Sequence, residues 1–521
     1  MQATLDSRVG GRWPWDCTLR LLRMRDRSHL YALLGVAAVA VTRILFRSRL
    51  LYDIDSVNFA LGMLRFDPAG FQPHPPGYFL YVCLARVIAL LLPDANAALV
   101  AISIAASCGA AWAIYLLTRE WFGRGPALTA IALFLVSPLC WFHGIVALTY
   151  IVEAFFSALI GYCCWRACRG EAGFALLASV IFALAAGFRP STALLLSPLW
   201  LFGVWRTPGI RRPLAMVAVA GAVMLAWFIP MTVAAGGIRA YFEAFRNLWS
   251  TVPGQRTTLS SPWLAVARTA TIAWIFALCF GSASVFLFGG KRAGTSKQPG
   301  RTTFLWVWIT PGLLFFAFVF LSFVNSGYLL VLSPPLFAVV ANRVYGFATG
   351  LDYRWARRAA VVAMLAANCA VFGFAPLYCS HRGVREFERE MSPLARDFQN
   401  SIDPANTLIV GFDAHFLGYR HAGYYLPRFV TVQYPEVSYR QGTRVFLMHE
   451  RNTEVAPSFC ATRFDRFVLF PLPEGSGYSE YMKTVLAKIP AGVLSTVTVG
   501  QHRVLTGPAS ALPLLFPATA R

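Results

Sequence analysis

The chain has 521 residues, of which 57% are hydrophobic and only 13% are charged. A soluble globular protein carries about 25% charged residues, so this composition excludes a soluble domain, a disordered chain and a small disulfide-rich secreted protein. Lysine and arginine number 46 against 24 aspartate and glutamate residues. Much of this excess lies in short loops between apolar segments, as membrane topology requires. We therefore expect a membrane protein with many spans, a lipid bilayer around it and no nucleic-acid partner.

Eleven apolar segments are predicted to cross the membrane, because a spanning helix needs about 20 apolar residues. Residues 1–28 are basic and precede the first segment without a small-residue cleavage site, so we expect them to be a cytosolic flank. The predicted spans are 29–46, 96–118, 125–141, 145–165, 172–188, 190–205, 213–235, 263–288, 303–323, 327–347 and 356–376.

Basic loops alternate with loops poor in lysine and arginine, such as 236–262, and this alternation predicts the topology. The basic loops begin at Arg119, Arg166, Arg206, Lys291 and Arg354. If they are cytosolic, a further apolar segment at 76–92 would break the parity as a span. We therefore expect 76–92 to lie against the outer face, in a first outer loop of 47–95 that also holds a helix at about 55–66. The C-terminus then lies outside.

Residues 379–521 differ in composition from the apolar part, 29–378, because they are charged and interrupted by prolines. Strand-like runs at 407–410, 429–432, 445–448 and 467–470 alternate with helix-like stretches at about 384–399, 414–425 and 478–489. This alternation predicts a small α/β domain, which parity places on the outer face. An oxidising compartment there permits a disulfide between Cys379 and Cys460.

Two aspartates, Asp53 and Asp55, follow the outer end of the first predicted span. A carboxylate at this position suits a general base or a metal ligand, although spacing alone favours Asp55 as the cap of a helix that starts at Ser56. The sequence has no glycine-rich phosphate loop and no Walker-type motif, so nothing else points to a nucleotide. We assign no cofactor and no metal site.

Three further polar residues are predicted to face the same side. His74 stands in the run His-Pro-Pro-Gly-Tyr at 74–78, where the prolines fix the entry into a helix, unless the histidine is incidental to a turn. Glu153 is placed about two turns inside a span, where it serves function or is bonded to a neighbouring helix. Arg189 suits a phosphate, or it extends to the interface as an ordinary snorkelling side chain.

His143 and Tyr328 complete the predicted cluster. His143 lies in a short outer loop, and Tyr328 lines the same cavity or belongs to the aromatic belt at the membrane surface. Acids, a histidine and an arginine on one membrane face, beside an outer domain, suit a lipid-linked phosphate substrate.

These motifs resemble those of the GT-C superfamily of integral-membrane glycosyltransferases. The likeness is to the bacterial family 39-type branch, with protein O-mannosyltransferases and the transferase that adds aminoarabinose to lipid A. Residues 55–60 are similar to the acidic motif of the first periplasmic loop, and 74–78 to the (H/K)PPL-type motif. Residues 328–335 look like the later RYLLPxxPP stretch, and 148–153 fall where a second acid is frequent. The likeness covers about 30–376.

The resemblance implies a polyprenyl-phosphate sugar, such as an undecaprenyl-phosphate sugar, as donor. It implies inverting transfer of one monosaccharide to a hydroxyl of a glycan, lipid or protein on the periplasmic face of the bacterial inner membrane. Such a donor gives no strong reason for a divalent metal. By the same resemblance Asp55 is the general base, and Arg189 binds the donor phosphate. From their positions in the sequence we expect the substrate site to be lined by Asp53, His74, His143, Glu153, Arg189 and Tyr328.

Three positions depart from the family pattern. Ser56 stands where many members carry Glu, Thr149 stands where the second Asp is expected, and Gly327 stands where Arg is usual. Two other classes remain open. A transporter or flippase of a lipid-linked substrate fits the many spans, although no inverted repeat is visible. A non-catalytic envelope scaffold explains the C-terminal part but leaves Asp55 and Glu153 without a role.

Overall fold

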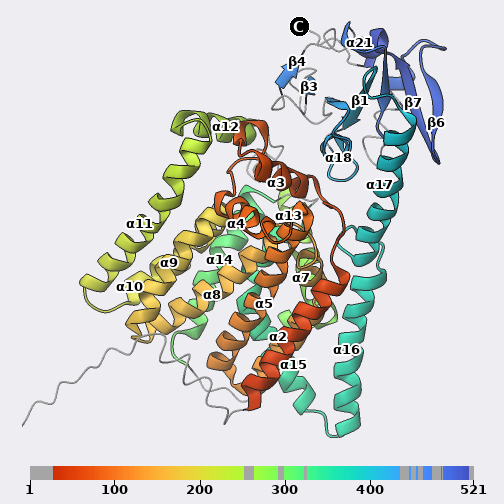
Figure 1. Cartoon of the computed structure of the whole chain (residues 1–521). Helices are drawn as coiled ribbons and strands as arrows, with labels where there is room; N and C mark the ends of the chain where they lie inside the picture. The colour runs from red at the N-terminus through yellow and green to blue at the C-terminus, as the bar shows by residue number, and fades with distance from the viewer. Residues whose placement is uncertain are drawn as a thin grey trace, which may run out of the picture.

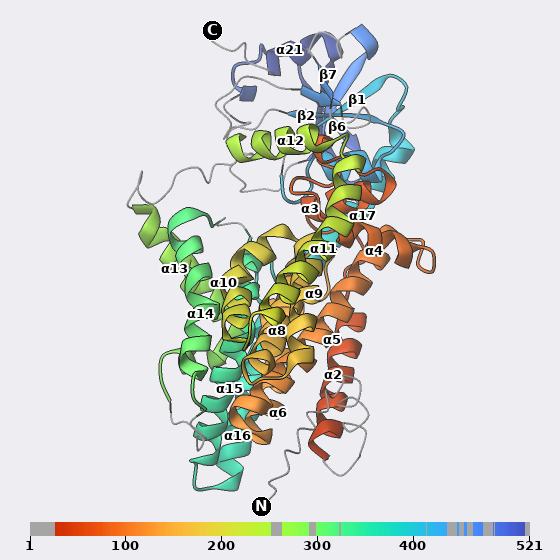
Figure 2. The same cartoon turned by 90° about the vertical axis from the view of Figure 1, so that its left-hand side faces the viewer.

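A helical bundle with a sheet domain at one end forms the computed structural model of this protein (Figure 1). The structure describes residues 27–251, 263–290, 298–321, 325–412, 414–434, 445–447, 453–455, 462–471, 483 and 485–515. We call the end of the bundle beside the sheet domain the sheet end and the opposite end the loop end. The turned view of Figure 2 shows the same two-part arrangement.

Within the described residues, eight helical segments are long and apolar enough to cross a membrane. The chain is therefore a multi-pass membrane protein, as its composition predicts. The eight are α2 (Arg27–Phe46), α5 (Ala95–Phe122), α8 (Tyr150–Cys168), α11 (Arg211–Ala234), α13 (Trp263–Phe280) with η3 (Gly281–Leu287), α14 (Arg301–Leu314) with η4 (Phe315–Val319), η5 (Ser326–Leu332) with α15 (Ser333–Thr349), and α16 (Arg354–Phe374).

Shorter apolar helices fill the bundle between these segments. They are α6 (Arg124–Val136), α7 (Pro138–His143), α9 (Ala172–Phe188) and α10 (Pro190–Arg206). α6 packs on α5, and α9 packs on α8 and α11. Prolines separate these helices, since the residue before a proline is held extended; Arg189 accordingly has φ −157° and ψ 107° between α9 and α10. The count of eleven spans stays a prediction, because α6, α9 and α10 are each shorter than any of the eight segments named above.

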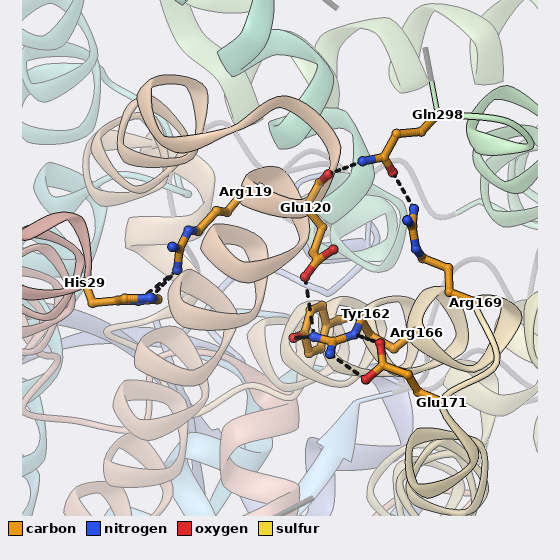
Figure 3. Close-up of polar contacts among 8 residues, drawn as sticks. All are labelled: His29, Arg119, Glu120, Tyr162, Arg166, Arg169, Glu171 and Gln298. Atoms are coloured by element: carbon orange, nitrogen blue, oxygen red, sulfur yellow. Dashed lines mark hydrogen bonds and ion pairs between the residues drawn. The ribbon is translucent and has the colours of Figure 1, made fainter. Parts of the chain in front are cut away.

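Basic loops predicted to be cytosolic meet at the loop end, where polar side chains join them (Figure 3). Arg166, near the end of α8, contacts Glu120 of α5 at 3.4 Å and also pairs with Glu171, which precedes α9. Gln298 donates to the carbonyl of Glu120 at 2.6 Å and accepts from Arg169 at 3.0 Å. Three loops therefore share one end, as the alternation of charge predicts, and their placement in the cytosol stays a prediction.

Two short helices lie at the sheet end in the loop after α2, where the sequence predicts two non-spanning helices; the placement of this loop on the outer face stays a prediction. α3 (Ile54–Leu64) and α4 (Phe79–Ala89) have 11 residues each, so each is about 16 Å long against a hydrocarbon core of about 30 Å. The turn η1 (Pro68–Gly70) lies between them. α4 packs on α3, α5 and α9, and so it lies against the bundle without crossing it.

One element at the sheet end differs from the prediction of a loop at 236–262. The structure has the helix α12 (Ile238–Thr251) there, lying across the sheet end (Figures 1 and 2). Its apolar residues recur at helical spacing on one face, but they are too few to form a membrane span. The length and hydropathy of an apolar segment therefore do not predict this helix. α12 packs on η1, and Tyr241 donates to the carbonyl of Pro76 at 3.1 Å.

The C-terminal part is an α/β domain, as predicted, and is reached through the long helix α17 (His381–Ser401). Its sheet has the strand order β4-β3-β2-β1-β5-β7-β6. The central strand β1 is fully buried and runs parallel to β2 and β5, whereas the other pairs are antiparallel. The elements are β1 (Thr407–Phe412), α18 (Tyr419–Tyr425), β2 (Val430–Tyr434), β3 (Val445–Leu447), β4 (Thr453–Val455), β5 (Arg466–Leu469), β6 (Ser495–Val499), β7 (His502–Pro508), η7 (Ala509–Ala511) and α21 (Leu512–Leu515).

All four predicted strands are present as β1, β2, β3 and β5, whereas the hairpin of β6 and β7 was not predicted. Half of the helix expected at 478–489 lies outside the described residues. Cys379 is a buried free thiol, and Cys460 lies outside the described residues.

Candidate functional site

Asp53, and not Asp55, caps the first outer helix. The Asp53 carboxylate accepts from the backbone amide of Asp55 at 2.9 Å, and α3 begins at Ile54. The interpretation that Asp55 caps a helix starting at Ser56 is therefore wrong. Because the capping role falls to its neighbour, Asp55 keeps its carboxylate for another partner. Its Oδ1 lies 3.3 Å from Nδ1 of His74.

His74 stands in a tight turn before α4. The amide of Gly77 donates to the carbonyl of His74 at 3.1 Å, and Gly77 has φ +105°, which favours glycine. α4 begins only at Phe79, so the two prolines form part of the turn and do not start the helix, contrary to the prediction. The turn places Nε2 of His74 3.1 Å from the hydroxyl of Tyr78.

The imidazole of His74 is therefore held between a carboxylate and a phenol. Burial lowers the pKa of His74; Arg189 lowers it further, whereas Asp55 and Asp53 act in the opposite direction. Side-chain exposure is 15% for His74 and 24% for Asp55, which leaves the carboxylate within reach of a reactant. A neutral imidazole offers one N–H and one lone pair, which suits these two neighbours.

Arg189 lies on the other side of Tyr78 from His74 and is surrounded by aromatic side chains. Its guanidinium carbon is 4.2 Å from the ring centroid of Tyr150, 5.4 Å from that of Tyr328 and 5.6 Å from that of Tyr78. Such contacts stabilise a cation through the negative faces of the rings. Tyr78 touches both His74 and Arg189 and so links the two parts of the cluster. Sequence reasoning did not single out Tyr150.

Glu153 is the ion-pair partner of Arg189. Its Oε2 lies 3.2 Å from Nε of Arg189, and Oε1 accepts from the hydroxyls of Ser191 at 3.0 Å and Thr192 at 2.9 Å. The carboxylate is 2% exposed. Because α8 begins at Tyr150, Glu153 stands in its first turn and not two turns deep, which corrects the prediction.

Two of the three departures from the family pattern have a structural reason here. Thr149 accepts from Nη1 of Arg189 at 2.7 Å, so it contributes to the setting of the arginine. Gly327 lies directly against the ring of Tyr150, and a Cβ added there would overlap it. An arginine at position 327 would therefore displace Tyr150 from Arg189.

His143 lies at the inner margin of the cluster. It ends α7, is 1% exposed, and its ring centroid is 5.1 Å from that of Tyr150. Neither ring nitrogen has a hydrogen-bond partner among the described residues. All predicted site residues thus belong to one contiguous cluster that runs from Asp53 to His143.

The sheet domain also reaches this cluster, which the sequence did not predict. The amide of Ile54 donates to the carbonyl of His415 at 2.9 Å, and Nδ1 of His415 lies 3.6 Å from the carboxylate of Asp53. Arg420 of α18 is 1% exposed and donates to the carbonyl of Gly70 at 3.2 Å. Across the described part of the chain, no group of three His, Cys, Asp or Glu side chains is arranged to hold a metal ion, so we assign none to a metal.

Comparison with known proteins gives matches in structure. No protein-family model matches the sequence, and no curated protein matches it. The crystal structure of ArnT from Cupriavidus metallidurans bound to undecaprenyl phosphate superposes with a TM-score of 0.59 at 13% identity, over 92% of this chain and 98% of that chain. Its apo state gives 0.58 at 13% identity, over 94% and 99%. This chain has the GT-C fold.

The apo oligosaccharyltransferase of Archaeoglobus fulgidus is similar over 85% of this chain and 70% of its own, with a TM-score of 0.51 at 12% identity. The likeness to ArnT includes the α/β domain, because it covers nearly the whole of both chains. The GT-C fold that the motifs resemble is therefore confirmed. At these identities the likeness establishes the fold, and the roles of individual residues depend on the geometry above.

Proposed function

We propose that this protein is a glycosyltransferase that moves one monosaccharide from a polyprenyl-phosphate sugar to a hydroxyl of a glycan, lipid or protein. The observation that carries the proposal is the partly exposed Asp55–His74 pair beside a buried arginine, at the sheet end of a GT-C bundle. A relative of this fold has been crystallised with undecaprenyl phosphate, which supports a lipid-phosphate donor. We place the sheet end in the periplasm of a bacterial inner membrane, with the N-terminus cytosolic.

Asp55 acts as general base in this proposal. The acceptor hydroxyl gives its proton to the Asp55 carboxylate while its oxygen bonds to the anomeric carbon of the sugar. The bond between that carbon and the phosphate oxygen breaks, the electron pair leaves with the polyprenyl phosphate, and the anomeric configuration inverts. A positioned base of this kind contributes about 10²–10⁴ in rate. His74, whose Nδ1 lies 3.3 Å from Oδ1 of Asp55, stands beside the carboxylate as a positioning residue.

Arg189 supplies positive charge where the phosphate departs. The negative charge on the leaving phosphate grows in the transition state, and a fixed cation nearby stabilises it. Glu153 and the rings of Tyr78 and Tyr328 hold the guanidinium in one orientation, so little reorganisation is needed during transfer. Asp53 holds the start of α3, and with it the backbone of Asp55.

The deciding experiment measures sugar transfer in purified membranes. Wild type and Asp55→Asn receive a panel of radiolabelled polyprenyl-phosphate sugars with a periplasmic extract as acceptor. We expect transfer from one donor in wild type and a loss of at least about 10²-fold in Asp55→Asn, because the amide cannot accept the proton. Asp94→Asn is the matched control, since Asp94 caps α5 and asparagine caps equally well.

If Asp55→Asn transfers sugar as fast as wild type, Asp55 is not the general base. If wild type consumes no donor while labelled lipid crosses the membrane of reconstituted vesicles, the protein is a transporter of a lipid-linked substrate.

A further inference from the structure

A basic cavity lies between the end of α2 and the helix α17, outside the Asp55 cluster. It has a volume of about 400 Å³ and is lined by Arg49, Arg385, Glu388, Arg389 and Ser392. Arg49 follows the end of α2, and the other four residues lie on α17. Three guanidinium groups and one carboxylate give this lining a net charge of plus two.

The single carboxylate of the cavity is engaged inside the protein. Oε1 of Glu388 accepts from the backbone amide of Arg49 at 2.5 Å, and Oε2 pairs with Nη1 of Arg385. Arg385 also donates to the carbonyl of Arg47 at 3.1 Å. Glu388 is 8% exposed. It therefore neutralises Arg385 and cannot serve a second cation.

Arg49 and Arg389 keep their charge for an anion from outside. In the part of the chain that the structure describes, no carboxylate pairs with either guanidinium, and Nε of Arg389 donates to the carbonyl of Arg385 at 3.2 Å. Both side chains are exposed. Guanidinium groups bind phosphate oxygens through two parallel hydrogen bonds, which makes phosphate the anion that this pair suits best.

The cavity stands at the height of lipid headgroups. The ends of α2 and α16 meet at Phe46 and Phe372, whose ring centroids are 5.9 Å apart, and the ring of His381 at the start of α17 lies 4.9 Å from that of Phe46. At 1.5 Å per residue, Arg385 lies about 6 Å beyond His381. Arg389 lies one turn further along α17, but its side chain turns back, with Nε 3.2 Å from the carbonyl oxygen of Arg385. The headgroup layer extends about 5–8 Å beyond the hydrocarbon core.

We infer that this cavity binds the phosphate of an anionic lipid headgroup from the adjoining leaflet. Arg49 and Arg389 hold the phosphate, and the net positive lining repels a headgroup that carries its own cation. The bound lipid joins the end of α2 to α17. The inference is independent of glycosyl transfer, because a lipid transporter with this fold would carry the same site.

The test uses the purified full-length protein in a nonionic detergent, with phosphatidylglycerol as the probe and native mass spectrometry as the measurement. We expect the double variant Arg49→Gln with Arg389→Gln to bind phosphatidylglycerol at least about tenfold more weakly than wild type, since two charged hydrogen-bond donors are lost. Arg396→Gln should bind like wild type, because Arg396 is an exposed arginine of α17 outside the cavity. If the double variant melts at the same temperature as wild type, its weaker binding reflects the loss of the site and not unfolding. If the double variant does not fold, the single variant Arg389→Gln takes its place in the test.

Four results would overturn the inference. Unchanged binding in the double variant would show that Arg49 and Arg389 do not hold the lipid. An equal loss in Arg396→Gln would show that any arginine on this surface attracts the anionic lipid. Inorganic phosphate that binds with the same arginine dependence, while phosphatidylglycerol does not bind, assigns the cavity to a free anion. Displacement of phosphatidylglycerol by equimolar undecaprenyl phosphate would place the lipid in the donor site.

Discussion

His74 is the residue whose protonation the structure constrains most directly at the outer loop. Burial lowers its pKa, so the folded protein holds the imidazole neutral where the unfolded chain, with a pKa of about 6.5, takes up a proton. The stability that this site contributes is therefore present above about pH 6.5 and is lost as the pH falls below that value.

The corresponding prediction concerns thermal unfolding of wild type and His74→Gln. Wild type should lose more melting temperature than the variant between about pH 7.5 and 5.5, because glutamine takes up no proton in the unfolded chain. Differential scanning fluorimetry in detergent measures both. Burial also lowers the pKa of His421, to about 4. Because His421 is present in both proteins, its effect on the melting temperature is the same in both and does not enter the comparison. Parallel pH profiles would contradict a buried neutral His74.

Motifs at the residue scale predicted much of this cluster, and the structure explains what they missed. Asp55 and His74 were found because acids and a His-Pro-Pro run are rare beside apolar segments. Tyr150 was missed because a tyrosine at a span end is ordinary, and only the fold brings its ring to Arg189. The same limit applied to Glu153, whose depth depended on where α8 begins.

At the scale of elements, a glycine sets how closely two helices of the bundle approach. Gly161 of α8 faces the fully buried Trp308 of α14, and a Cβ there would overlap the indole ring. The same indole donates to Ser157 at 3.0 Å, and Ser157 donates to the carbonyl of Val331 at 2.5 Å. The packing of Gly161 against Trp308 and these two hydrogen bonds together hold α8, α14 and η5 in contact.

Gly161→Ala should destabilise the protein by about 1–3 kcal/mol, because the added methyl group overpacks this interface. Gly221→Ala is the control, since nothing lies within 4 Å of a Cβ at that position on α11. The control should be neutral or more stable by up to about 1 kcal/mol, which is the gain in helix propensity from glycine to alanine. Equal melting temperatures for the two variants would show that α8 and α14 do not pack as closely as the structure has them.

Helices and strands were predictable where one clear pattern of apolar residues or of loop charge runs along the sequence. Long apolar runs and alternating loop charge predicted the bundle, and buried strands such as β1 were visible as apolar runs. The helix α12 was not predictable from hydropathy alone, because it lies along the sheet end with only part of its surface apolar. The hairpin of β6 and β7 contains few apolar residues, and its pairing depends on the edge that β5 offers.

At the scale of the whole molecule, the sheet domain and the first outer loop form one connected unit. Hydrogen bonds tie residues 51–54 to the C-terminal part: the amide of Leu51 donates to the hydroxyl of Tyr425 at 2.8 Å, and the amide of Ile54 donates to the carbonyl of His415 at 2.9 Å. The hydroxyl of Tyr52 donates to the carbonyl of Tyr378, just before that part, at 2.6 Å. These bonds lie immediately before Asp55. The position of the proposed base therefore depends on the sheet domain as well as on the bundle.

Arg420 tests this dependence, because it joins α18 to the turn η1 through the carbonyl of Gly70. Arg420→Met leaves that carbonyl without its donor and loosens the loop between Asp55 and His74, where a misplacement of about 1 Å can cost up to 10²-fold in rate. We expect the kcat of sugar transfer to fall about 10–100-fold with little change in donor KM, since Arg189 and its neighbours stay in place. Arg503→Met, an exposed arginine of β7, should match wild type. Wild-type turnover in Arg420→Met would mean that the domain only rests on the loop and does not position Asp55.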